Sequence, residues 1–283
     1  MKHLISLLAF SFLIGCDGEK SNVAPSKDSP EEAASEAKPP EAVSVNPNLK
    51  YKIKGDAVTI TRCAEGASGD FVIPTKIEGK TVTSIEYRAF RYCTSLTSIT
   101  IPDGVTSIGN NAFYRCTNLT SITIPDSVTS IEYRAFYKCT SLKSIAIPDS
   151  VISFGDGAFD SCTSLKSITI GDSVTSIGEA EFFDCSSLTN ITIPDSVTKI
   201  RNYAFSYCTS LTTITIPDSV TTIGESAFWS CPSLTAINFL GDAPNIENDA
   251  FKESSPTIYR EPDAKGWGDT LAGRPVKLIT EKP

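Results

Sequence analysis

Hydrophobic residues recur along most of this chain with a period of 23 residues, and polar residues alternate with them inside each period. Each unit runs C-T-S-L-T-S-I-T-I-P-D-S-V-T-S-I-x-x-x-A-F-x-x, so apolar side chains fall into columns when the units are aligned. In the segment L-x-x-I-x-I, Ile99 and Ile101 point to one side of a strand and Thr100 points to the other. Because no coil can bury its apolar side alone, the pattern predicts stacked coils that share one core.

The residues after each strand predict changes of chain direction. Pro102 and Asp103 favour a turn, because proline has a fixed φ and aspartate bonds to nearby backbone groups. Val105 begins a second inward-facing segment, and the following Ala112-Phe113 pair is expected on a single helical or 3₁₀ turn. The sequence therefore predicts a repeat solenoid that is mainly β with short helical or 3₁₀ turns.

The signature LTSITIPDSVTSIGNNAFYRC occurs, with minor change, at residues 96–101 and 119–139. This pattern resembles the BspA-like subgroup of bacterial leucine-rich repeats, and the resemblance covers about residues 71–253. It implies a right-handed leucine-rich-repeat superhelix of 23-residue coils, with short helical turns opposite the main strand face. By analogy with that family, it also implies adhesion to proteins of hosts or neighbouring cells.

Segments on both sides of the repeats are expected to cap the ends of the solenoid. Residues 51–63, YKIKGDAVTITRC, predict a hairpin, and residues 256–279 resemble the C-terminal cap of the same family. Caps are needed because an open coil end exposes apolar side chains and an unpaired sheet edge. We therefore expect a capping hairpin at residues 50–72, leucine-rich repeats at 73–253 and a C-terminal cap at 254–283.

The start of the chain resembles a bacterial lipoprotein signal peptide. The apolar run LISLLAFSFLIG at residues 4–15 is shorter than the roughly 20 residues that a membrane-spanning helix needs. Its end, L-I-G-C, resembles a lipobox, which implies cleavage before Cys16 and attachment of a diacylglyceryl group to the Cys16 thiol. The alternative is a plain secretory signal with an incidental cysteine. With residues 1–15 as signal peptide, we expect an extracytoplasmic protein of the bacterial cell envelope, in the periplasm or at the cell surface.

Residues 16–49 are rich in proline, alanine, glutamate and serine and contain no aromatic side chain. Such a segment cannot bury enough apolar surface to become ordered. We expect it to be a disordered tether between the lipid anchor at Cys16 and the repeats.

Charge and composition exclude several classes of function. The formal net charge of -8, from 33 acidic and 25 basic residues, argues against a nucleic-acid partner. The one histidine, His3, lies in the signal peptide, so a Ser–His–Asp or Cys–His mechanism is not available. The repeats offer no carboxylate pair in an aromatic cleft of the kind that glycosidases use. We therefore expect no enzyme, no catalytic residue, no cofactor and no metal site.

Seven cysteines also repeat at the 23-residue step: Cys93, Cys116, Cys139, Cys162, Cys185, Cys208 and Cys231. Metal binding is disfavoured because the chain has neither a C-x-x-C pair nor a histidine in the repeats. No base repeats beside the column to activate a thiolate. Disulfides between neighbouring coils are allowed by distance, but parallel coils aim the Cβ vectors the same way. Cysteine behaves as a small hydrophobe, so we expect this column to pack in the core.

An aspartate follows each turn proline or glycine at the same step: Asp103, Asp126, Asp149, Asp172, Asp195 and Asp218. The favoured interpretation is a turn aspartate that bonds to backbone N–H groups. Cation binding by this column remains open as a second interpretation.

The positions around the Ala-Phe pair vary between units that otherwise repeat almost unchanged. Tyrosine, tryptophan and arginine, which are enriched at protein interfaces, collect there. The candidate partner-binding residues are Tyr87, Arg88, Arg91, Tyr92, Tyr114, Arg115, Tyr133, Arg134, Tyr137, Lys138, Tyr203, Tyr207 and Trp229. Acidic residues are expected to follow on the same face in the middle coils: Asp156, Asp160, Glu179, Glu181 and Asp184.

These observations favour a non-enzymatic envelope lipoprotein whose solenoid binds another macromolecule, in protein–protein interaction or adhesion. The alternative is a structural spacer or envelope component with no specific ligand, in which the variable positions have merely drifted on an outer face.

Overall fold

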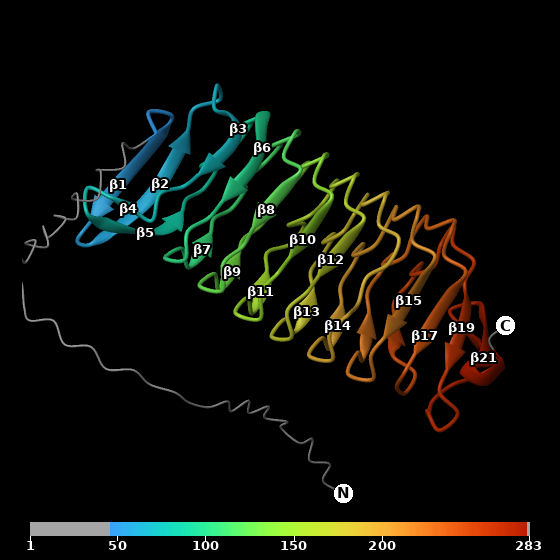
Figure 1. Cartoon of the computed structure of the whole chain (residues 1–283). Helices are drawn as coiled ribbons and strands as arrows, with labels where there is room; N and C mark the ends of the chain where they lie inside the picture. The colour runs from blue at the N-terminus through green and yellow to red at the C-terminus, as the bar shows by residue number, and fades with distance from the viewer. Residues whose placement is uncertain (1–45, 282–283) are drawn as a thin grey trace, which may run out of the picture. The chain divides into compact units, whose positions relative to one another are not determined.

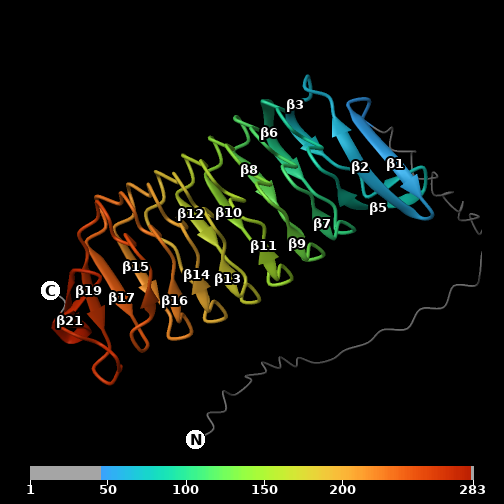
Figure 2. The same cartoon turned by 180° about the vertical axis from the view of Figure 1, so that it is seen from behind.

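The computed structural model describes residues 46–281, which form one array of stacked coils (Figures 1 and 2). Each regular coil contains a first strand, a Pro-Asp turn, a short second strand and a pair of tight turns around the phenylalanine. Most first strands of neighbouring coils pair in parallel, as do most second strands. The pairing is interrupted between β8 and β10 and between β12 and β15 in the first series, and between β11 and β13 in the second. The partners in the regular pairs are 23 residues apart, as Ser107 and Ser130 are. The expected solenoid of 23-residue coils is therefore confirmed.

The strands form two series that run along the array. The first-strand series contains β3 (Ser68–Val72), β6 (Ser95–Thr100), β8 (Ser121–Thr123), β10 (Ser144–Ala146), β12 (Ser167–Thr169), β15 (Thr213–Ile216), β17 (Ala236–Phe239), β19 (Thr257–Arg260) and β21 (Arg274–Leu278). The second-strand series contains β5 (Lys80–Ile85), β7 (Ser107–Ile108), β9 (Ser130–Ile131), β11 (Ser153–Phe154), β13 (Ser176–Ile177), β14 (Lys199–Ile200), β16 (Thr222–Ile223) and β18 (Asn245–Ile246). The remaining elements are β1 (Leu49–Lys54), β2 (Ala57–Cys63), β4 (Lys76–Ile77), β20 (Thr270–Leu271) and the 3₁₀ helix η1 (Ile279–Glu281).

The two ends of the array depart from the regular coil. At the N-terminal end, β1 and β2 form an antiparallel hairpin around Gly55, and β2 pairs in parallel with β5. Glu78 and Gly79 both have positive φ and join β4 to β5 in a two-residue hairpin of type I′. At the C-terminal end β21 pairs with β19 and with β20, and the Trp267 ring packs 5.1 Å from that of Phe239.

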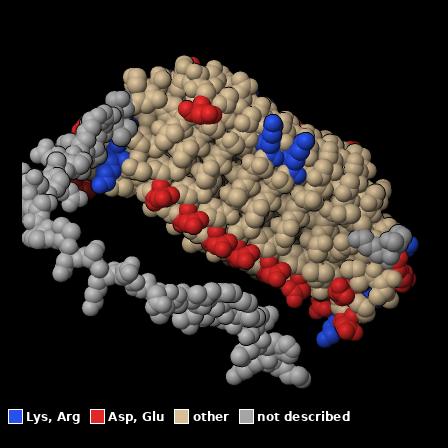
Figure 3. Space-filling view, viewed as in Figure 1, with Lys and Arg blue, Asp and Glu red and all other residues tan. Residues whose placement is uncertain are grey.

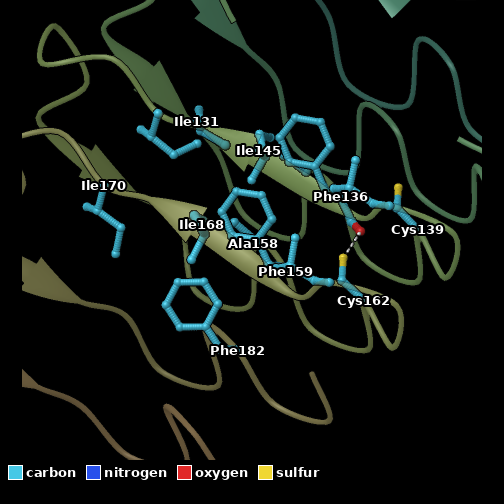
Figure 4. Packing of buried hydrophobic residues seen from close by; sticks show 14 of the residues in the cluster. Ile131, Phe136, Cys139, Ile145, Ala158, Phe159, Cys162, Ile168, Ile170 and Phe182 are labelled. Carbon is cyan, nitrogen blue, oxygen red and sulfur yellow. Dashed lines mark hydrogen bonds between the residues drawn. The ribbon is translucent and has the colours of Figure 1, made fainter. Parts of the chain in front are cut away.

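One apolar core runs through all the coils. The column of phenylalanines forms a continuous stack in which successive ring centroids, from Phe90 to Phe251, lie 5.1–5.8 Å apart. Figure 4 shows Phe136, Phe159 and Phe182 stacked beside the isoleucines of the first strands. Leucine, valine and alanine columns complete the same buried cluster, so each coil is covered by its neighbours.

The helical or 3₁₀ turn expected at Ala112-Phe113 is absent, because the turns there have another hydrogen-bond pattern. The N–H of Ala112 donates to Gly109 O within its own coil, at 3.1 Å. The N–H of Phe113 instead donates to Ala135 O of the next coil, at 2.8 Å. A helix needs every N–H to donate within its own segment, whereas here alternate N–H groups join neighbouring coils. Within residues 46–281 the one helical element is η1.

Candidate functional site

Two residues in each coil, one on either side of the phenylalanine, adopt the left-handed backbone conformation. They are the third residues of tight turns, such as Glu86–Ala89 and Phe90–Cys93, which have the geometry of type II β-turns. One column with positive φ contains Arg88, Asn111, Arg134, Gly157, Ala180, Tyr203, Ser226 and Asp249. The other contains Tyr92, Arg115, Lys138, Ser161, Asp184, Tyr207, Ser230 and Glu253. Several of the variable side chains are therefore fixed in direction by the backbone of the turns.

Tyrosines from three successive coils lie in ring contact. The Tyr92 and Tyr114 centroids are 5.7 Å apart in an edge-on arrangement, and the Tyr114 and Tyr137 rings stack at 5.0 Å. We call these three tyrosines, together with Arg91, Arg115 and Lys138, the tyrosine–arginine ladder. The ladder is built from the two residues that follow each of three phenylalanines. The tyrosine comes before the cation in the second and third of these coils, whereas Arg91 comes before Tyr92 in the first.

The basic side chains of the ladder lie over the tyrosine rings. The guanidinium carbon of Arg91 is 4.5 Å from the Tyr92 centroid and 5.5 Å from the Tyr114 centroid. Arg115 lies 5.8 and 5.6 Å from the same two rings, and the ammonium of Lys138 is 5.3 Å from Tyr137. Arg91 also donates a 3.3 Å hydrogen bond to the Tyr92 hydroxyl, which lowers the pKa of that phenol. These contacts hold two guanidinium groups beside the same tyrosine pair.

The four residues just N-terminal to these phenylalanines extend the basic region. Arg88 lies over Tyr87 at 4.5 Å, and Arg134 lies over Tyr133 and Tyr137 at 5.0 and 4.8 Å. Tyr87 and Arg88 line an open pocket of about 390 Å³ with Arg91 and Tyr92 of the ladder. Thr61 and Arg62 of β2, and Glu65 in the turn after it, complete this pocket. Sequence reasoning missed these three, because they lie outside the repeat and carry no periodic signal.

Of the candidate cations, Arg134 is the one that forms an ion pair with a described carboxylate. Its Nη2 is 3.9 Å from Oδ2 of Asp160, which is 7% exposed. Burial raises the pKa of Asp160, although a 2.7 Å hydrogen bond from Ser161 Oγ and the charge of Arg134 oppose this increase. The basic region therefore meets an acidic region at this coil.

The acidic residues do not all lie on the surface as the sequence suggested. Asp156 pairs with Arg201 at 2.6 Å, and Glu179 is exposed. Glu181, however, is fully buried, and neither of its carboxylate oxygens has a hydrogen-bond partner among the described residues. The expectation that Glu181 lies on the variable face is wrong, because this position belongs to the alanine column that faces inward.

The C-terminal candidates form a separate aromatic contact. Tyr207 lies 5.0 Å from Trp229 and 5.3 Å from Phe183. Tyr203 makes no ring contact with another described residue. The structure thus brings the candidates together as one basic group in the first coils and a smaller aromatic group further along, with the acidic residues between them in sequence.

The cysteine column lies in the core, as expected, and also makes a directional contact. The eight cysteines within residues 46–281 are buried and none forms a disulfide with another. Cys162 Sγ donates to Phe136 O of the preceding coil at 3.2 Å, as Figure 4 shows. The same contact recurs at 3.0–3.3 Å for the other cysteines from Cys116 to Cys231. In the next coil Ser254 takes the cysteine position, and its Oγ donates to Phe228 O at 2.6 Å.

The turn aspartates are exposed and form a line because they repeat every 23 residues. Figure 3 shows such a line of acidic side chains along one edge of the array. The expected backbone bond occurs at Asp149, whose Oδ1 accepts the N–H of Asp172 at 3.0 Å. Within residues 46–281 no group of three histidine, cysteine or carboxylate side chains is arranged to hold a metal ion. Cys16 and residues 17–45 of the expected tether lie outside the described residues. The last residue of that segment, Leu49, is buried and begins β1, so the ordered part of the chain starts earlier than expected. Residues 46–281 contain no helix long and apolar enough to cross a membrane.

Comparison with known proteins places this geometry among bacterial repeat proteins. The family model described as "BspA type Leucine rich repeat region" matches in 6 copies, over residues 72–155 and 129–257. The chain is similar to the leucine-rich repeat protein of T. pallidum, at 31% identity and a TM-score of 0.58 over 62% of this chain and 83% of that one. It is similar also to a leucine-rich cell surface protein from Faecalibacterium prausnitzii, at 32% identity and a TM-score of 0.65 over 76% and 69% of the two chains. A search of the curated proteins finds no match.

Proposed function

Since the chain belongs to the family of BspA-type leucine-rich repeat proteins, we propose that it is a non-enzymatic cell-envelope protein that binds a protein partner through the tyrosine–arginine ladder. The observation that supports this most is the contact of three tyrosines with basic side chains from successive coils. Tyrosine and arginine supply much of the binding energy at protein interfaces. A stack of rings held by turns also loses little conformational entropy on binding.

The location of the protein is part of the proposal. A relative with 32% identity is described as a cell surface protein, and the lipobox-like sequence at Cys16 is of the kind that directs lipidation. We infer that the chain is extracytoplasmic and is attached to a membrane through a diacylglyceryl group on Cys16. The segment between Cys16 and β1 would then separate the repeats from the membrane.

Crosslinking on intact cells tests the binding role. A photoreactive group placed at Tyr133, which is 42% exposed and lies beside the ladder, should crosslink the partner. The variant Tyr114→Ala/Tyr137→Ala should lower the crosslinked yield, because each hot-spot tyrosine is worth roughly 1–2 kcal/mol. A matched control, Thr97→Ala/Thr120→Ala on the first-strand face, should leave the yield unchanged. Loss of the crosslink in the control alone would place the site on the other face.

The alternative, a spacer without a specific ligand, is favoured by one feature. The exposed positions of the first-strand series are mostly serine and threonine, whose short side chains offer few distinctive contacts. If the tyrosine variants and the control give the same crosslinks as the unchanged protein, the spacer would be the better description.

A further inference from the structure

We propose that the tyrosine–arginine ladder recognises a short acidic segment of its partner polypeptide. This inference rests on the proposed binding function and adds the chemistry of the partner. It comes from the unpaired cations, their arrangement around two tyrosines, and the acidic residues that limit the site on one side.

The ladder contains two arginines without a carboxylate partner among the described residues. Arg91 and Arg115 both lie within 6 Å of the Tyr92 and Tyr114 centroids, yet neither forms an ion pair with a described carboxylate. The Nε atom of Arg115 is also buried without a hydrogen-bond partner among the described residues. Two like charges held beside the same pair of rings repel each other, and a bound anion would relieve that repulsion.

The guanidinium groups of the ladder favour a carboxylate as the bound anion. A guanidinium group presents a planar fork of N–H donors that matches a carboxylate in two parallel hydrogen bonds. The adjoining pocket of about 390 Å³ adds Arg88 to Arg91, together with the Tyr87 and Tyr92 rings. Arg62 and Glu65 also line it, but they pair with each other at 3.7 Å, so the net positive charge of the pocket comes from Arg88 and Arg91. Carboxylates spaced along a peptide, with apolar groups between them to cover the rings, would satisfy both parts of this surface.

Acidic residues beside the ladder limit the length of the anionic segment that it can bind. Beyond Arg91 and Arg115, a bound polyanion would reach Asp156, Asp160 and Asp184. Arg134, and Lys138 at the last coil of the ladder, are already close to carboxylates there. The chain as a whole has a formal net charge of -8. A long, densely charged polymer such as a nucleic acid or a sulfated polysaccharide would be repelled there, whereas a segment that spans the first coils would not.

Fluorescence anisotropy with labelled peptides and the full chain tests this proposal. The probes are a peptide with several glutamates and tyrosines, its glutamine counterpart and its lysine counterpart. We expect the glutamate peptide to bind at least about tenfold more tightly than the others, and binding to weaken at high salt. The variant Arg91→Glu/Arg115→Glu should reduce its affinity by about tenfold or more. Arg91→Gln/Arg115→Gln keeps the size of the side chains and should give a smaller loss in the same direction.

The matched control is Lys143→Glu/Lys166→Glu on the first-strand side. It changes the net charge by the same amount at two exposed residues away from the ladder. Its affinity for the glutamate peptide should stay within about twofold of the unchanged protein. Equal losses in both charge variants, or equal binding of the glutamine peptide, would overturn the proposal. Heparin serves as a probe for a densely charged polysaccharide. Tighter binding of heparin than of the glutamate peptide would also overturn the proposal.

This test separates the two proposals. If the cellular crosslink depends on Tyr114 and Tyr137 but no glutamate peptide binds, the acidic-segment inference fails and the binding function stands. If the crosslinked yield is unchanged in the Tyr114→Ala/Tyr137→Ala variant, the proposed binding function fails as well.

Discussion

Glu181 is a carboxylic acid at a fully buried position of the core where the other coils have alanine. The equivalent residues of the other coils are Ala89, Ala112, Ala135, Ala158, Ala204, Ala227 and Ala250. A Cβ on Gly178 would lie 2.7 Å from Oε2 of Glu181, so glycine at that position leaves room for the larger side chain. Burial raises the pKa of Glu181 well above its usual value, and the charge of Asp156 adds to this effect. The backbone N–H of Ala158 is near the carboxyl and acts in the opposite direction, but it does not reach hydrogen-bond geometry and its effect is smaller.

Replacing this carboxyl should stabilise the protein at neutral pH. Because the folded-state pKa of Glu181 is raised, the folded protein binds a proton that the unfolded chain releases, and stability falls as pH rises from the usual glutamate pKa towards the folded value. Glu181→Ala should therefore raise the free energy of unfolding by about 1–3 kcal/mol at neutral pH, and by less in acid. Urea unfolding across a pH series measures this difference.

The control for that variant is Glu179→Ala, which removes an exposed carboxylate two residues away. It should change the free energy of unfolding by less than about 0.5 kcal/mol at every pH. A Glu181→Ala protein that is less stable than the unchanged protein at neutral pH would show that the carboxyl has a stabilising partner.

The cysteine column supports a second prediction at this scale. Cys162→Ala should lower the free energy of unfolding by about 1 kcal/mol, since it removes a buried sulfur and its contact with Phe136 O. Cys162→Ser should cost less than Cys162→Ala if the directional contact matters, because Ser254 already makes this bond to Phe228 O. Denaturant unfolding of the two variants shows whether the hydrogen bond to Phe136 O or the apolar volume of the side chain accounts for the loss of stability. Serine as the worse replacement would show that apolar packing alone selects cysteine.

The paired turns are the element that the repeat builds most often, and they use residues that seldom adopt positive φ. Ser230 is one of them, with φ at 56°. Its N–H donates to Lys252 O of the next coil at 2.9 Å, so the backbone cannot leave this conformation without losing a hydrogen bond between coils. Ser230→Gly should be neutral or stabilising, since glycine adopts this conformation freely. Ser230→Val should destabilise by about 1–3 kcal/mol, because a β-branched side chain is strained there. Thermal unfolding compares the two, and an equally stable valine variant would contradict the strained turn.

The accuracy of the sequence predictions follows the kind of signal that each element carries. The alternation in L-x-x-I-x-I located the first strands, and the repeated columns predicted the shared core correctly. The turns were mistaken for helix because residues such as Arg88 and Tyr92 stand where glycine would have signalled positive φ. At the site, variability identified the tyrosines and arginines of the ladder. It also assigned Glu181 to the surface, since a polar residue in an apolar column looks the same in sequence whether it is buried or exposed.

At the scale of the whole molecule, the proposed anchor can be tested without reference to the repeats. Cys16→Ala should abolish incorporation of a labelled fatty acid and release the protein from the membrane fraction without detergent, or leave it unprocessed. Cys162→Ala is the matched control, because it removes a thiol that the fold keeps buried. Equal membrane association and labelling of the two variants would contradict lipidation at Cys16.

The constant offset between paired strands has a consequence for how such a chain can evolve. Ser153 pairs with Ser130, and Ile200 pairs with Ile177, each 23 positions apart, so one coil meets the next through nearly the same contacts everywhere in the regular part. Unequal recombination within the gene could remove or duplicate whole coils, for instance residues 163–185, and leave matching interfaces at the new junction. Each such event would shorten or lengthen the array and bring different outward side chains next to each other. Descendants of one gene could thus acquire new surface combinations without having to solve the packing of a new core.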